Sequence, residues 1–100
     1  MIRHIVMWKL KESAEGADKA TNAAKVKAWL DTCHGLVPGM GIFEVAVATP
    51  GLEATCDVVL YAEFDDKAAL DAYQSHPTHA ALMPKISAVR SERHCMDFVA

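Results

Sequence analysis

The sequence predicts an α+β domain in which helices cover one face of a four-stranded antiparallel sheet. The first observation is the order of the segments, because strand-like and helix-like patterns alternate as β-α-β-β-α-(α)-β. The second is that the first strand is apolar on both faces, which is typical of a sheet covered on both sides. A chain of 100 residues is the size of one domain, and we expect a single domain over residues 1–100.

The first strand is predicted over residues 2–10. Ile5 and Met7 lie on one face, between Arg3 and Lys9. The opposite face carries Ile2, His4, Val6, Trp8 and Leu10. A histidine within such an apolar row is a candidate for a pocket wall as well as for a buried core position.

A long helix is predicted from Asp18, a suitable N-cap residue, to about His34. The preceding segment from Ser13 is expected to be a loop, and Gly35 is the natural stop. Four apolar residues recur at helical spacing and form the predicted buried stripe, namely Ala23, Val26, Leu30 and Cys33.

Two further strands are predicted over residues 42–49 and 56–64, after a turn at Pro38-Gly39. The connection between these strands begins at Pro50-Gly51. In the earlier strand, alternation places three residues on one face, Phe43, Val45 and Val47.

The last third of the chain is predicted to hold two short helices and a strand. Asp65 or Asp66 caps a helix over residues 67–75, and Pro77 is suited to the first turn of the next one. Pro84 is expected to kink or restart this helix, because proline cannot donate to the helix ladder. The closing strand is expected over residues 93–99.

This order of elements is the ferredoxin-like βαββαβ arrangement. Helices on one face of the sheet leave the face with Ile5 and Met7 uncovered. A second copy of the same sheet, related by two-fold symmetry, is the economical cover. We therefore predict a homodimer through the sheet face, giving a dimeric α+β barrel.

Composition excludes several classes of function. The apolar fraction is 52%, above the usual value of about 45–50%. Net charge is −3 and the basic residues are scattered, so no nucleic acid partner is expected. The longest apolar stretch, residues 36–48, is short and interrupted, so no membrane partner is expected.

The cysteines and the first residues indicate the compartment. Cys33, Cys56 and Cys95 are odd in number and contain no CxxC pair, so neither a disulfide framework nor a zinc site is predicted. Arg3 interrupts the first apolar stretch, and no signal peptide is predicted. These features favour a reducing cytoplasm.

The most informative motif is Tyr73-Gln-Ser-His76-Pro77-Thr-His79, which places a phenol and two imidazoles across a helix junction. Together with Ile2-Arg-His4-Ile-Val6 and the closing Asp97-Phe98-Val99, it resembles the stress-responsive A/B barrel (Dabb) family. The resemblance covers nearly the whole chain and implies a dimeric ferredoxin-like barrel.

The resemblance also implies site residues. In a polyketide cyclase of that family, the tyrosine and the second histidine of this motif are the catalytic pair, and they match Tyr73 and His79. A pocket histidine on its first strand matches His4. Another pocket histidine of that enzyme falls near Val58 here and is absent, so the resemblance implies a pocket but does not extend to that enzyme's substrate.

The chemistry of these residues supports one hypothesis directly. A neutral imidazole can remove a proton next to a carbonyl, and a phenol can donate to the enolate oxygen that forms. We assign His79 as general base and Tyr73 as acid, orienter or oxyanion donor. His4, His76 and Trp8 are candidate binding residues, with a small apolar ligand. No cofactor is needed for such chemistry.

Structural roles are the alternative for the same residues. Tyr73 can be core with its hydroxyl bonded to an imidazole, His76 can cap a helix, and His79 can tie that helix to His4. A metal site at His76 and His79 is disfavoured, because no adjacent carboxylate completes it. No metal is expected.

Three functions therefore remain open. The chain is a cofactor-free cyclase, isomerase or lyase acting on a carbonyl or polyketide-like compound, or a non-catalytic stress-response or ligand-binding module. A cofactor-independent monooxygenase of the same fold is the third alternative. An open cavity between His79 and Tyr73 would favour an enzyme, and a filled core would favour the module.

Overall fold

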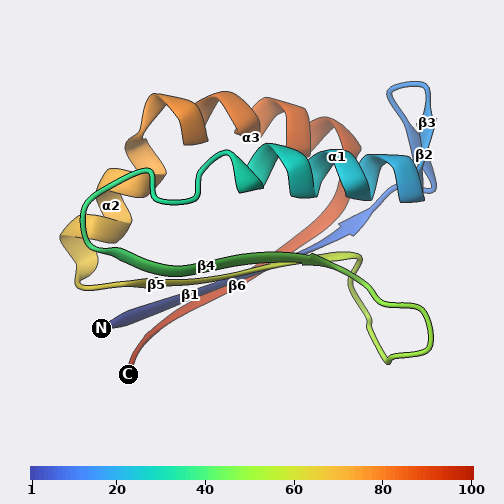
Figure 1. Cartoon of the computed structure of the whole chain (residues 1–100). Coiled ribbons are helices and arrows are strands. Elements are labelled where there is room, and N and C mark those ends of the chain that lie inside the picture. The colour runs from blue at the N-terminus through green and yellow to red at the C-terminus, as the bar shows by residue number, and fades with distance from the viewer.

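The computed structural model describes all 100 residues and confirms the predicted α+β class with a ferredoxin-like arrangement. An antiparallel sheet has the strand order β4-β5-β1-β6, and its helices all lie on one face (Figure 1). Its strands are β1 (Ile2–Leu10), β4 (Met40–Val47), β5 (Val58–Phe64) and β6 (Arg90–Val99). The helices are α1 (Lys19–Asp31), α2 (Lys67–Ser75) and α3 (Pro77–Val89). None of these helices has the length and apolar character needed to span a membrane.

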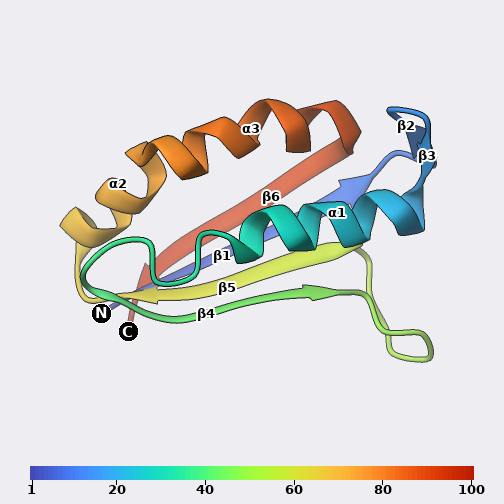
Figure 2. The ribbon, with the colours of Figure 1, turned by 45° about the horizontal axis from the view of Figure 1, so that its top comes forward.

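Strand β1 is central, between β5 and β6, and its alternation sets the two faces of the sheet. On the helix side, His4, Val6, Trp8 and Leu10 are all buried. On the opposite side, Met7 keeps 40% of its surface exposed. The core therefore lies between the sheet and the helices, where α1 runs over the β4 side and α3 over the β6 side (Figure 2).

Helix α1 begins as predicted, with the Asp18 carboxylate accepting the backbone N–H of Thr21 at 2.8 Å. The predicted buried stripe is confirmed, since Ala23, Val26, Leu30 and Cys33 are all buried. The helix ends at Asp31 instead of His34, because turn structure occupies the residues up to Gly35.

The predicted loop before α1 is instead a small hairpin of β2 (Ser13–Ala14) and β3 (Ala17–Asp18). Glu15 and Gly16 both have positive φ, 52° and 73°, as the tight two-residue hairpin turn requires. The hairpin is attached to α1 by Asn22, whose side-chain amide donates to the carbonyl of Ala14 at 3.0 Å.

Helix α2 has the predicted bounds, and Asp66 is its cap, accepting the N–H of Ala69 at 2.9 Å. The prediction for Pro84 was wrong in part: α3 is longer than expected and does not restart there. Pro84 is exposed, and its neighbours Leu82 and Ile86 are buried against the core. Their packing holds the helix although one ladder hydrogen bond is missing.

Strand bounds differ from the predictions at four ends. Strand β4 starts and ends two residues early, β5 starts at Val58, and β6 follows α3 directly at Arg90. Phe43 and Val45 are buried as expected, whereas Val47 is 36% exposed because it closes the strand at the rim of the core.

No helix covers the second face of the sheet (Figure 1). Ile5 is half-buried there, and Met7 is paired in register with His94. Ile42 and Met96 are 55% and 66% exposed. This open face is the apolar surface for which the sequence predicted a cover.

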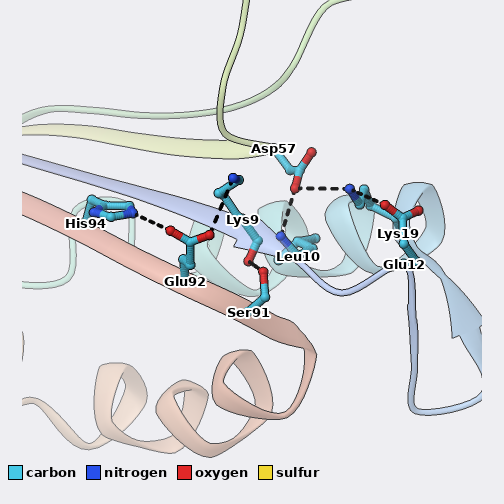
Figure 3. Close-up of polar contacts among 8 residues, drawn as sticks. All are labelled: Lys9, Leu10, Glu12, Lys19, Asp57, Ser91, Glu92 and His94. Carbon is cyan, nitrogen blue, oxygen red and sulfur yellow. Dashed lines mark hydrogen bonds and ion pairs between the residues drawn. The ribbon is translucent and has the colours of Figure 1, made fainter.

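Charged side chains gather at one end of the sheet (Figure 3). Asp57 accepts the N–H of Leu10 at 2.8 Å and lies 3.7 Å from the ammonium of Lys19. Nearby, the Glu92 carboxylate lies 3.4 Å from Lys9 and 3.1 Å from His94. These contacts join β1 to the β4–β5 connection and to β6.

Candidate active site

The fold brings together three of the predicted site residues from three different elements. Tyr73 on α2 and His79 on α3 have ring centroids 4.6 Å apart. The His4 ring on β1 is 6.2 Å from that of Tyr73. The junction at Pro77 turns the chain sharply enough to place both rings of the motif beside the first strand.

Tyr73 is fully buried, and its ring packs against two aromatic neighbours. The centroids of Phe64 and Phe43 lie 5.3 Å and 5.9 Å away. Its hydroxyl is also buried and has no hydrogen-bond partner. Burial, with a smaller effect of Cys33, raises the pKa of this phenol far above its ordinary value of 10.0. Tyr73 is therefore a neutral hydrogen-bond donor and not a base at neutral pH.

His79 is half-buried, and one ring nitrogen is used by the backbone. Its Nδ1 lies 2.9 Å from the carbonyl oxygen of Gln74, which can only accept, so Nδ1 carries the proton. Nε2 of the neutral ring then holds the lone pair. Burial lowers the pKa of His79 below its ordinary value of 6.5, and the charges of His4 and Arg93 act in the same direction. The hydrogen bond to Gln74 opposes this shift. His79 is thus available to accept a proton.

His4 is 3% exposed and has a carboxylate partner that the sequence did not reveal. Its Nδ1 contacts Oδ1 of Asp97, the residue opposite it in the β1–β6 register. A carboxylate at Nδ1 fixes the tautomer and the orientation of an imidazole. The feature that could have revealed Asp97 is the pairing of the first and last strands, which places residue 97 beside residue 4.

The remaining two predicted binding residues have different surroundings. Trp8 is buried and lines the cavity between the two histidines and Tyr73. His76 lies at the start of α3, where its Nδ1 accepts the N–H of Thr78 at 3.1 Å. That contact is a helix cap, and His76 is not among the residues that line the cavity. Its predicted part in binding stays a prediction.

The cavity between the three rings is small, about 30 Å³. This space holds a water molecule or two and is far below the roughly 300–1,000 Å³ of most ligand sites. A larger hollow of about 490 Å³ adjoins it, since Trp8, Met83 and Arg93 line both. The sequence did not point to Arg93.

The structure contains no group of three or more histidine, cysteine or acidic side chains arranged to hold a metal ion. The two histidines of the cluster each contact another group of the protein. His4 contacts Asp97, and His79 contacts a backbone carbonyl. What the arrangement offers chemically is one neutral donor, Tyr73, beside two imidazoles.

Comparison with known proteins places this arrangement in a family. The profile of the stress responsive A/B barrel domain, Dabb, matches residues 2–100. The chain belongs to this family. A search of curated proteins gave no significant match for this Dabb protein.

Solved structures share the fold over nearly the whole chain. A dimeric ferredoxin-like protein from Bacteroides fragilis is 25% identical, with a TM-score of 0.81 over 99% of this chain and 95% of that chain. Another dimeric ferredoxin-like protein, from Thermobifida fusca, is 20% identical, with a TM-score of 0.84 over 99% and 90%. A hydroxynitrile lyase from Passiflora edulis is 13% identical, with a TM-score of 0.76 over 99% and 92%.

Proposed function

We propose that this Dabb protein is a homodimeric, cofactor-independent enzyme that transfers a proton at a carbon next to a carbonyl group. This is the chemistry of small cyclases, isomerases and lyases. The observation that carries the proposal is the buried Tyr73 hydroxyl, which has no partner although two imidazoles lie beside it. The three unpaired cysteines fit action in a reducing cytoplasm.

In the proposed step, Nε2 of His79 takes the proton from the carbon next to the carbonyl. The electron pair of the broken C–H bond forms a C=C bond, and the π pair of the carbonyl moves to its oxygen, which gives an enolate. The Tyr73 hydroxyl donates a hydrogen bond to that oxygen, where the raised pKa keeps its proton in place. If the proton returns to another carbon, the product is an isomer. If the enolate carbon attacks a second carbonyl group of the same molecule, the product is a ring.

Trp8 and the His4–Asp97 pair support this step as walls of the cavity. The Asp97 carboxylate holds the His4 ring in one orientation, and Trp8 excludes water from the reacting end of the substrate. Because the cavity is small, the carbonyl end alone enters it, and Met83 yields to admit it. Methionine is suited to that movement, since its side chain is flexible and unbranched.

One relative shows that this fold can carry an enzyme. The Passiflora edulis structure is named a hydroxynitrile lyase and shares the fold with this chain. At 13% identity the likeness concerns the fold, so the assignment of chemistry depends on His79 and Tyr73 of this chain.

A non-catalytic ligand-binding or stress-response module is the second candidate. The observation that favours it is the volume of about 30 Å³ between the rings, which is nearly a filled core. In that case the cluster stabilises the junction of α2 and α3 with β1. The two candidates differ in one measurable property, which is turnover.

Solvent proton exchange is the experiment that tests the proposed step. Methyl hexyl ketone is incubated in D₂O with the protein, and loss of the proton signals next to the carbonyl is followed by NMR. We expect wild-type protein to accelerate the exchange and His79→Gln to be slower by about 100- to 10,000-fold, the usual contribution of a general base. Glu12→Gln changes an exposed carboxylate outside the cavity; it is the control and should exchange like wild type. Equal rates for wild type and His79→Gln would contradict the proposal.

We propose that the homodimer forms through the open face of the sheet. The Bacteroides fragilis and Thermobifida fusca relatives are dimeric, and the exposed Met7, Ile42 and Met96 need a cover. Met7→Lys should convert the dimer to a monomer in analytical ultracentrifugation, because a buried unpaired charge is costly. Ala24→Lys adds the same charge on the exposed side of α1 and should leave the dimer intact. A wild-type monomer at micromolar concentration would contradict the dimer.

A further inference from the structure

The hollow beside the cavity has an unusual concentration of arginine. The chain contains three arginines, and two of them, Arg90 and Arg93, line this hollow. The net charge of the chain is −3, so the local charge is opposite to the overall one. The hollow lies on the helix side of the sheet, opposite the open face.

Neither guanidinium has a partner in the protein. The cation in every ion pair of the chain is a lysine or a histidine. Neither Arg90 nor Arg93 forms a side-chain hydrogen bond. Arg90 caps the C-terminus of α3, where the negative end of the helix dipole accounts for a cation. Arg93 has no such structural explanation.

Arg93 also connects the hollow with the cavity, because it lines both together with Trp8 and Met83. The walls are otherwise mainly apolar, with Ile86 and Pro84 from α3. A molecule that lies along this path has an apolar body between α3 and β1. One end meets the guanidinium groups and the other points toward Tyr73 and His79.

We propose that the ligand of this site is an apolar carbonyl compound that carries an oxyanion, a carboxylate or a phosphate, bound by Arg93 with help from Arg90. The guanidinium group is the side chain best matched to such oxyanions, because it offers parallel N–H donors. The inference rests on the proposed function for the identity of the reacting end, and it adds the charge of the distal end.

Binding can be followed by the fluorescence of Trp8, which lines the hollow and the cavity. In a Trp29→Phe background Trp8 is the remaining tryptophan, since the chain has two. This protein is titrated with octanoate, octyl phosphate and octanol, which share the apolar chain and differ in the end group. We expect saturable binding of at least one anion, with octanol weaker by about tenfold or more. The tighter of the two anions identifies the headgroup.

Variants assign the effect to the two arginines. Arg93→Gln should weaken binding of the preferred anion about tenfold and leave octanol unchanged, and Arg90→Gln should have a smaller effect in the same direction. Lys67→Gln removes a positive charge from the exposed surface of α2 and is the matched control. Added salt should weaken anion binding by wild type more than by Arg93→Gln, which keeps only the contribution of Arg90.

Three results would overturn the inference: no saturable anion binding, equal binding of octanol, or an unchanged anion affinity in Arg93→Gln. The outcome is separate from that of the exchange experiment. Anion binding without proton exchange would retain the oxyanion site and reject the catalytic role of His79. Proton exchange without anion selectivity would retain the catalytic role of His79 and reject the oxyanion site.

Discussion

Two polar regions of this protein differ in how their groups are satisfied. At the end of the sheet, the side chains of Glu92, Asp57 and Lys19 each have partners, and all three are at least partly exposed (Figure 3). In the candidate active site, His4 is buried against Asp97, while the fully buried Tyr73 has a hydroxyl with no partner.

We interpret the difference as one between a structural arrangement and the proposed active site. Exposed ion pairs contribute about 0–1 kcal/mol each and mainly fix the ends of the strands. A buried hydroxyl without a partner costs about 1–3 kcal/mol of stability, and a phenylalanine would avoid that cost. Sites at which a fold keeps such a group are typically sites of binding or catalysis.

The largest expected effect on stability comes from removing the carboxylate of the half-buried His4–Asp97 pair. Asp97→Ala leaves Nδ1 of His4 buried without its partner, so we expect a loss of about 1–3 kcal/mol in the free energy of unfolding. Urea denaturation measures it at a fixed protein concentration. Glu92→Ala, at the other polar region, is the comparison. If Asp97→Ala and Glu92→Ala lower the free energy of unfolding by the same small amount, the proposed difference between the two regions is wrong.

The pH dependence of stability tests whether the folded protein favours the neutral form of His79. Its pKa is lowered in the folded protein, so below about pH 6.5 the unfolded chain binds the proton more readily. This group therefore destabilises the fold as the pH falls below that value and has no effect above it. In urea denaturation, His79→Gln should lose less stability than wild type between about pH 7 and pH 5. A steeper loss in the variant would show that the folded protein favours the charged ring.

The smallest effect is expected at the exposed network. Lys19 lies 3.1 Å from Glu12 and 3.7 Å from Asp57, and its side chain is 35% exposed. Lys19→Ala should lower the free energy of unfolding only slightly, and the difference should vanish in high salt. Thermal unfolding at low and high salt measures this. A salt-independent loss of several kcal/mol would mean that this region is more than a surface arrangement.

Much of the fold could be predicted because local signals agree with it. The caps at Asp18 and Asp66 and the alternation of β1 are local, and the structure contains them. The hairpin at Glu15-Gly16 was missed because its strands are two residues long and carry no alternation. The restart that was one of two expectations at Pro84 does not occur, because tertiary packing outweighs one lost hydrogen bond.

The candidate site could be predicted only in part, for a similar reason. Tyr73 and His79 lie in one motif, and the family resemblance added His4. Asp97 and Arg93 lie on the last strand, and their placement depends on the register between β1 and β6. The volume of the cavity depends on how large side chains pack, which no spacing in the sequence reports.

The most direct test of the central claim is Tyr73→Phe, with proton exchange and stability measured on the same preparation. We predict that exchange next to the carbonyl falls by about 100- to 1,000-fold, because the oxyanion loses its donor. The free energy of unfolding should stay the same or rise, because the hydroxyl has no hydrogen bond to lose. Unchanged exchange with a loss of about 0.5–1.5 kcal/mol would contradict the account and make Tyr73 a structural residue.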